Sequence, residues 1–176
     1  SMKRKLYPIL TSLGLLLAIT ACQEFNELMP QGANSKKNSK VLVQEIATGS
    51  VLKGANGINF GPDGNLYIGS VNGQEIIVMN SQNGKIIKKI GTDKGVTTPD
   101  DLAFGPDGSL YWTDIFTGEV GRMTPEGVVT KQFVAPGVNP ITFSADGRLI
   151  VGLCFLGDGL YELDPNLVDA PRPIIV

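Results

Sequence analysis

One short pattern occurs three times in this chain. The copies are INFGPDGNLYIG at 58–69, LAFGPDGSLYWT at 102–113 and ITFSADGRLIVG at 141–152. Their phenylalanines, Phe60, Phe104 and Phe143, are spaced 44 and then 39 residues apart. A period of about forty residues with strand-forming content is typical of the blades of a β-propeller. We therefore expect an all-β protein built from four-stranded antiparallel blades.

Each copy predicts the inner half of a blade. A short apolar strand leads into a Gly-Pro-Asp-Gly turn or its equivalent, where proline fixes φ and the last glycine accepts left-handed backbone. The second strand is almost continuously apolar, which indicates burial on both faces. A glycine turn, a third strand, another turn and an outer fourth strand complete each unit. We interpret Asp63, Asp107 and Asp146 as turn residues, because a calcium loop needs several oxygen ligands at closer spacing.

The number of copies raises a question of ring closure, since closed propellers usually have about four to eight blades and this chain contains three. We expect a truncated propeller, with three blades present of about six. The segment VLVQEIA at 41–47 is predicted to be an extra strand, and the chain ends inside the expected outer strand of the third blade. The alternative is self-association of two half-rings through exposed blade faces. It requires Pro171 and Pro173 to keep the tail from forming an edge strand, so that 41–47 of a partner supplies that edge.

The first forty residues predict a secretory signal and a tether. Three basic residues precede an apolar run at 6–21, which is interrupted by polar residues and proline and is shorter than the roughly twenty residues of a spanning helix. The run ends in Ile-Thr-Ala-Cys, which resembles a bacterial lipobox and makes Cys22 the predicted lipidation site; the alternative is a cysteine that follows a cleavage site by chance. Residues 1–22 are thus the expected signal, 23–40 a flexible tether and 41–176 the propeller. We expect export across the bacterial cytoplasmic membrane and a lipid anchor in the cell envelope.

Composition excludes several functions. Acidic residues outnumber basic ones, and no basic stripe interleaved with aromatics suggests nucleic acid. The chain contains no histidine, which excludes a Ser-His-Asp triad and a histidine-ligated zinc, and it has no phosphate-binding glycine loop. Without a histidine to lower its pKa, Cys154 is expected to be a buried, inert thiol.

Alignment of the copies places three polar residues, Asn56, Asp100 and Asn139, just before the innermost strands of successive blades. In a propeller this position opens on the central channel, where side chains from different blades converge on a shared site. The alternative is structural, because Asn and Asp at such positions often bind backbone N–H groups in turns. The aromatic residues Tyr67, Tyr111 and Trp112 are expected to pack between blades.

The segments ANGINFGPDG at 55–64 and TPDDL at 98–102, followed by the tryptophan-containing strand, resemble the SMP-30/gluconolactonase/LRE-like family of six-bladed propellers. The PDG turns are shared with NHL-repeat propellers. The resemblance covers 41–176 and implies a divalent cation in the channel, held by a glutamate, an asparagine and an aspartate. By motif, Asn56 would be the neutral ligand and Asp100 the carboxylate ligand and catalytic base; Asn139 is a third candidate ligand. The family's glutamate motif is not recognisable here, and its PDG reads Pro-Asp-Asp.

Hard oxygen donors suit Ca²⁺, Mg²⁺ or Mn²⁺, which polarise carbonyl groups and activate water. The resemblance therefore implies a lipid-anchored hydrolase acting on a small lactone or ester with a divalent cation. The alternative is a non-catalytic propeller that binds a protein or small ligand at the cell envelope. Streptogramin lyases, a related propeller family that requires histidine, are excluded by the absence of that residue.

Overall fold

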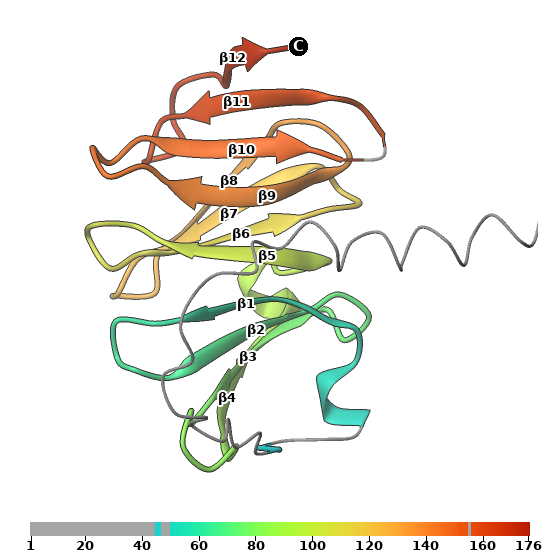
Figure 1. Cartoon of the computed structure of the whole chain (residues 1–176), viewed down its shortest axis with the longest axis vertical. Coiled ribbons are helices and arrows are strands. Elements are labelled where there is room, and N and C mark those ends of the chain that lie inside the picture. Colours follow the sequence, from blue (N-terminus) through green and yellow to red (C-terminus); the bar gives the residue numbers. More distant parts are fainter. Residues whose placement is uncertain (1–44, 47–49, 155) are drawn as a thin grey trace, which may run out of the picture. The chain divides into compact units, whose positions relative to one another are not determined.

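The computed structural model describes residues 45–46, 50–154 and 156–176. These residues form three four-stranded antiparallel sheets, so the predicted all-β architecture of four-stranded blades is confirmed (Figure 1). The predicted signal at 1–22, with Cys22, and the tether at 23–40 lie outside the described residues. So does most of the predicted extra strand at 41–47. Within the described part of the chain, no helix has the length and apolar character needed to cross a membrane.

Each blade is a meander in which consecutive strands pair. A 3-10 turn, Ser50–Leu52, precedes the first blade, and another, Thr92–Lys94, precedes the second. The strands of the first blade are β1 (Ala55–Phe60), β2 (Leu66–Ser70), β3 (Glu75–Met79) and β4 (Ile86–Ile90). Those of the second are β5 (Pro99–Phe104), β6 (Leu110–Asp114), β7 (Glu119–Met123) and β8 (Val129–Phe133). Those of the third are β9 (Val138–Phe143), β10 (Leu149–Leu153), β11 (Gly159–Leu163) and β12 (Arg172–Ile175).

The turns between the first two strands of each blade have the predicted chemistry. The Asp63 carboxylate accepts the backbone N–H of Asn65 at 3.1 Å, and that of Asp107 accepts the N–H of Ser109 at 3.0 Å. The glycine that ends each turn has a left-handed φ, between 75° and 85° in the three copies. The interpretation of these aspartates as turn residues is confirmed.

Successive blades bury each other's apolar faces. Tyr67 of β2 meets Phe104 of β5 edge-on, with ring centroids 4.9 Å apart, and Tyr111 of β6 meets Phe143 of β9 in the same way at 5.0 Å. Trp112 is fully buried in the cluster between the first two blades. The prediction that these aromatics pack between blades is confirmed, and the repetition of the contact explains why the sequence pattern recurs.

The chain's tail completes the third blade. β12 pairs with β11, with Leu160 opposite Ile175 and Tyr161 opposite Pro173. Proline is tolerated in an outer strand because its missing N–H faces away from the sheet. The half-ring alternative required the prolines to keep the tail out of the sheet, and the structure shows that this condition is not met.

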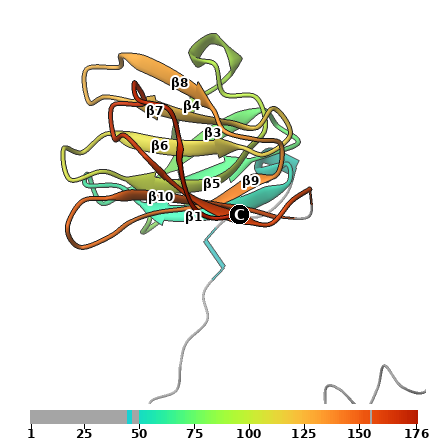
Figure 2. The ribbon, with the colours of Figure 1, turned by 90° about the horizontal axis from the view of Figure 1, so that it is seen from above.

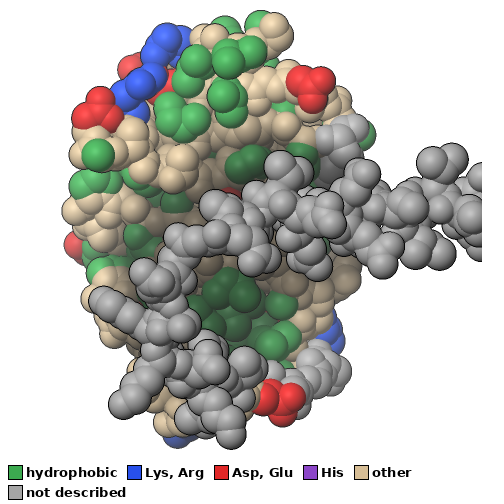
Figure 3. Space-filling model, in the orientation of Figure 1, with side chains coloured by type: hydrophobic (Ala, Val, Ile, Leu, Met, Phe, Trp, Pro, Cys, Tyr) green, Lys and Arg blue, Asp and Glu red, His purple; other side chains and the backbone are tan. Residues whose placement is uncertain are grey.

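The two end blades expose apolar side chains. Ile58 and Phe60 of β1 are 58% and 64% exposed, whereas the equivalent Leu102 is buried against the first blade. At the other end, Ile174 and Ile175 of β12 are exposed, and apolar side chains gather over this end of the molecule (Figure 3). Exposed apolar faces of this kind favour association with another chain. Self-association through them stays a prediction.

The innermost strand of every blade contains a β-bulge. Two residues of β1, at 56–57, stand opposite Gly69, and two of β5, at 100–101, stand opposite Thr113. The pair at 139–140 in β9 stands opposite Gly152. The three polar residues predicted to precede these strands therefore lie within them. Bulges re-aim side chains and are common next to functional sites.

Candidate functional site

The first two candidate residues meet across neighbouring blades. The side-chain amide of Asn56 donates a hydrogen bond from Nδ2 to Oδ1 of Asp100. Asn56 is exposed, whereas Asp100 is only 3% exposed. The second carboxylate oxygen, Oδ2 of Asp100, is buried and has no hydrogen-bond partner among the described residues. A buried carboxylate oxygen without a donor is costly, so this atom is the strongest sign of an unfilled interaction at the site.

Burial raises the pKa of Asp100 above its ordinary value of 3.8. The hydrogen bond from Asn56 acts in the opposite direction, and the negative charge of Asp101 raises the pKa further. Desolvation and a like charge both disfavour the ionised form, so a nearby cation or proton is bound more readily here than by an exposed carboxylate.

The bond between these residues depends on close approach of β1 and β5. A Cβ built at Gly57 would lie 2.4 Å from the backbone oxygen of Asp100, so glycine is required at this position. Farther along the same pair of strands, Nδ2 of Asn59 donates to the backbone oxygen of Leu102 at 3.1 Å. The two innermost strands are thus joined at both positions by asparagine side chains.

Asp101 joins the second blade to the third. In the sequence it stands out only as a departure from the family pattern, and it was not predicted to belong to the site. Its Oδ2 accepts the backbone N–H of Ile141 at 3.0 Å. Its own N–H donates to Oγ1 of Thr113, which in turn donates to the backbone oxygen of Asn139 at 3.0 Å. The bulge of β5 therefore contacts the first blade through Asp100 and the third through Asp101. The two consecutive aspartates at 100–101 are the feature of the sequence that could have indicated this double role.

Asn139, the third candidate, makes a different side-chain contact. Its Nδ2 approaches Sγ of Cys154 at 3.6 Å, and no hydrogen bond links it to Asn56 or Asp100 among the described residues. Cys154 is a free thiol of intermediate exposure, so the expectation that it is buried was wrong. Cys154 follows the last residue of β10, beyond the buried part of that strand.

The donors at this site fit a hard cation in part. Oδ2 of Asp100 is suitable as a carboxylate ligand, and the amide oxygens of Asn56 and Asn139 are suitable as neutral ligands. In the described ranges, no group of three or more His, Cys, Asp or Glu residues is arranged to hold a metal. One carboxylate and two amides would supply only part of the shell of a divalent ion.

A second buried carboxylate serves as a contrast. Asp114, at the end of β6, accepts the backbone N–H groups of Thr97 and Thr98 at 2.9 and 2.7 Å and Nε1–H of Trp112 at 3.0 Å. It also forms an ion pair with Lys131 at 3.0 Å. Both oxygens of Asp114 have partners, so its role is structural. Oδ2 of Asp100, in contrast, has none within the ranges that the structure covers.

No protein-family profile matches the chain. No curated protein sequence matches it either. Solved structures do match the chain in fold. Virginiamycin B lyase from Staphylococcus aureus is 20% identical with a TM-score of 0.64, over 79% of this chain and 47% of the lyase. A catalytically inactive histidine-to-alanine form of that lyase, with quinupristin, is 22% identical with a TM-score of 0.59, over 69% of this chain and 41% of the lyase. A candidate gluconolactonase is 19% identical with a TM-score of 0.56, over 69% of this chain and 49% of that protein.

These likenesses establish the β-propeller fold. The chain spans less than half the length of each of the three structures, at 41–49%.

Proposed function

We propose that this chain is a lipid-anchored propeller of the bacterial cell envelope that hydrolyses a small lactone or ester with a divalent cation. The observation that carries the proposal is Asp100, a buried carboxylate. One of its oxygens accepts a hydrogen bond from Asn56, and the other has no hydrogen-bond partner in the described part of the chain. The likeness in fold to a candidate gluconolactonase supports the same reaction class. The lipid anchor rests on the lipobox-like sequence that ends at Cys22.

In this proposal Asp100 and Asn56 hold the ion, with Asn139 as a further neutral ligand. The ion, when bound, polarises the carbonyl of the substrate and lowers the pKa of water. The hydrogen bond from Asn56 holds one carboxylate oxygen of Asp100 in place, so that the other oxygen can bind the ion or accept a proton. The raised pKa of Asp100 suits a group that accepts a proton during hydrolysis.

Lyase chemistry is not proposed. The inactive lyase variant differs by replacement of a histidine, and this chain contributes no histidine. A carboxylate and amide oxygens favour hydrolysis assisted by a hard cation instead.

The test is hydrolysis of a panel of lactones and esters by the full chain with Ca²⁺, Mg²⁺ or Mn²⁺. Turnover that a chelator abolishes and that Asp100→Asn removes would support the proposal. Asp146→Asn, at an exposed turn position, is the matched control and should keep full activity. Metal-independent ligand binding without turnover would overturn the proposal and favour a non-catalytic binding protein.

A further inference from the structure

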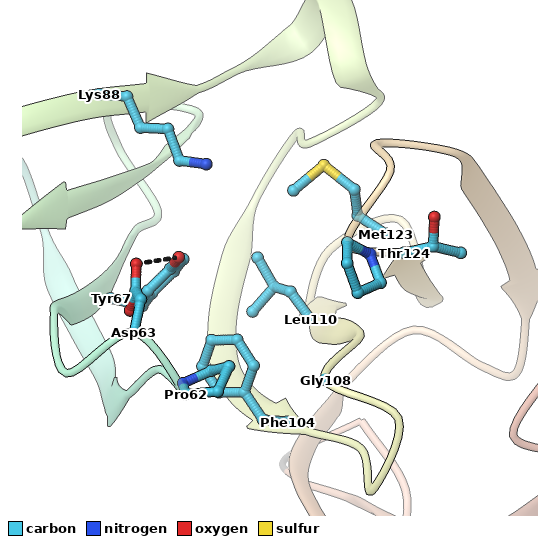
Figure 4. A pocket seen from close by; sticks show the side chains of 10 residues that line it. Pro62, Asp63, Tyr67, Lys88, Phe104, Gly108, Leu110, Met123 and Thr124 are labelled. Carbon is cyan, nitrogen blue, oxygen red and sulfur yellow. Dashed lines mark hydrogen bonds between the residues drawn. The ribbon is translucent and has the colours of Figure 1, made fainter.

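A hollow lies between the first two blades, at the opposite end of the strands from Asn56. It has a volume of about 300 Å³, at the lower limit for small-molecule pockets. Its polar side chains are Asp63, Tyr67 and Lys88 of the first blade and Thr124 of the second (Figure 4). Most of its apolar wall comes from the second blade, through Phe104, Leu110, Met123 and Pro125. Asn56 is the second residue of β1, whereas Asp63 lies in the turn after that strand, so this hollow is separate from the Asp100 site.

The same position between the second and third blades is filled by an arginine. Asp107 and Tyr111 are the equivalents of Asp63 and Tyr67, and the residue paired with Tyr111 on the next strand is Arg122. Its guanidinium donates to Oδ2 of Asp107 at 2.8 Å and lies 6.0 Å from the centre of the Tyr111 ring. In the first blade, the residue paired with Tyr67 is Val78. The first interface therefore has the aspartate and the tyrosine but not the cation between them.

A second difference widens the same space. Tyr111 of the second blade donates its hydroxyl to the backbone oxygen of Pro165 in the third blade at 2.7 Å, and Leu167 of the third blade is buried in the core. Leu167 and its counterpart in the second blade, Gly127, each stand four residues after the third strand of their blade, and both have a left-handed φ. A Cβ built at Gly127 would meet nothing within 4 Å. The leucine that helps to close the second interface is thus missing from the first.

The polar groups of the first interface are arranged differently, because no arginine lies between the tyrosine and the aspartate. The Tyr67 hydroxyl donates to Oδ2 of Asp63 at 3.2 Å, the atom equivalent to the one that Arg122 contacts in Asp107 (Figure 4). Burial and the charge of Asp63 raise the pKa of Tyr67 to about 12, so this hydroxyl stays a donor at neutral pH. Lys88 is paired with Val78 across β3 and β4 and forms no ion pair within the described residues. Its ammonium faces the hollow from the side opposite Met123 (Figure 4).

We propose that this hollow binds a small ligand that carries a guanidinium at one end and a carboxylate at the other, as arginine does. The guanidinium takes the place at Asp63 that Arg122 occupies at Asp107, and the Tyr67 hydroxyl turns to the backbone oxygen of Pro125, as Tyr111 does to Pro165. A guanidinium matches a carboxylate in charge and geometry and packs on aromatic rings. The aliphatic part of the ligand contacts Phe104, Leu110 and Met123, and its carboxylate pairs with Lys88.

Calorimetric titration of the full chain with L-arginine, and with agmatine, which lacks the carboxylate, tests this site. Asp63→Asn should weaken arginine binding about tenfold or more, because a charge-assisted hydrogen bond is lost. Lys88→Ala should weaken the binding of arginine but should not weaken the binding of agmatine. Asp146→Asn and Lys85→Ala, at exposed positions away from the hollow, are the matched controls and should bind as the wild type does.

A filling variant gives an independent test. Val78→Arg should reproduce the Arg122 arrangement in the first interface and abolish arginine binding while the protein stays folded. Absence of arginine binding to the wild-type chain at millimolar concentration would overturn the proposal. Equal affinity of the wild type and Asp63→Asn would also overturn it, even if Val78→Arg proved unstable. None of these outcomes depends on the hydrolase proposal, since the two sites share no residue.

Discussion

Asn56 and Asp100 are 44 residues apart in the chain, and the amide of the first donates to the carboxylate of the second across the innermost strands of adjacent blades. The contact brings together an exposed neutral donor and a buried acid. It requires a bulge in both strands and a glycine next to the asparagine.

Replacement of Asp100 by asparagine is expected to stabilise the metal-free protein at pH 7. Because the pKa of Asp100 is raised, the folded state holds this proton more tightly than the unfolded state does. The stability contributed by the protonated form is therefore present at low pH and is lost as the pH rises through the raised pKa. Urea unfolding should show a gain of about 1 kcal/mol at pH 7 that shrinks below pH 4. An equal effect at both pH values would contradict the assignment.

A divalent cation is expected to stabilise the wild type. A ligand that binds only the folded state raises the free energy of unfolding with its concentration. Melting temperatures of the wild type should therefore rise as Ca²⁺, Mg²⁺ or Mn²⁺ is added, whereas those of Asp100→Asn should not change. Asp146→Asn should respond as the wild type does, because its turn is remote from the site; a loss of the response there would indicate a general surface effect.

Gly57→Ala is expected to destabilise the protein by about 1–3 kcal/mol, the usual cost of forcing extra volume into a packed contact. The added Cβ would come within 2.5 Å of the backbone of both Asp100 and Asp101. The measurement is urea unfolding, with Gly91→Ala as the control. A Cβ at Gly91 makes ordinary contacts of 3.7 Å or longer. Similar effects of the two substitutions would refute the close approach of β1 and β5.

The tyrosine–phenylalanine contact between blades predicts that the same Phe→Leu substitution affects stability differently in different copies of the repeat. Phe104→Leu and Phe143→Leu should each cost about 1 kcal/mol, because each ring meets a tyrosine of the preceding blade edge-on. Phe60→Leu should cost much less, since Phe60 is 64% exposed. Thermal or urea unfolding of the three variants checks this order. An equal loss in Phe60→Leu would show that a partner also covers this ring.

The blades were predictable from the sequence because their signals are local. The turn residues, the apolar second strands and the spacing of Phe60, Phe104 and Phe143 are all visible in the repeat. Alignment of the copies also predicted that Asn56 and Asp100 face a common site, whereas the hydrogen bond between them is seen only in the structure.

The bulges were not predictable, since they depend on which residue of the next strand stands opposite. The role of Asp101 and the contact of Asn139 with Cys154 depend on the same registers. The hollow at Asp63 becomes visible only when Val78 and Arg122 are known to occupy equivalent positions.

The proposed function depends above all on Asp100 as a cation ligand. Titration of the full chain with Mn²⁺, monitored by the electron paramagnetic resonance signal of the free ion, measures this binding. We expect saturable binding that is lost in Asp100→Asn, weakened in Asn56→Ala and unchanged in Asp146→Asn. Binding of equal strength in the wild type and Asp100→Asn, or no binding to the wild type, would contradict it.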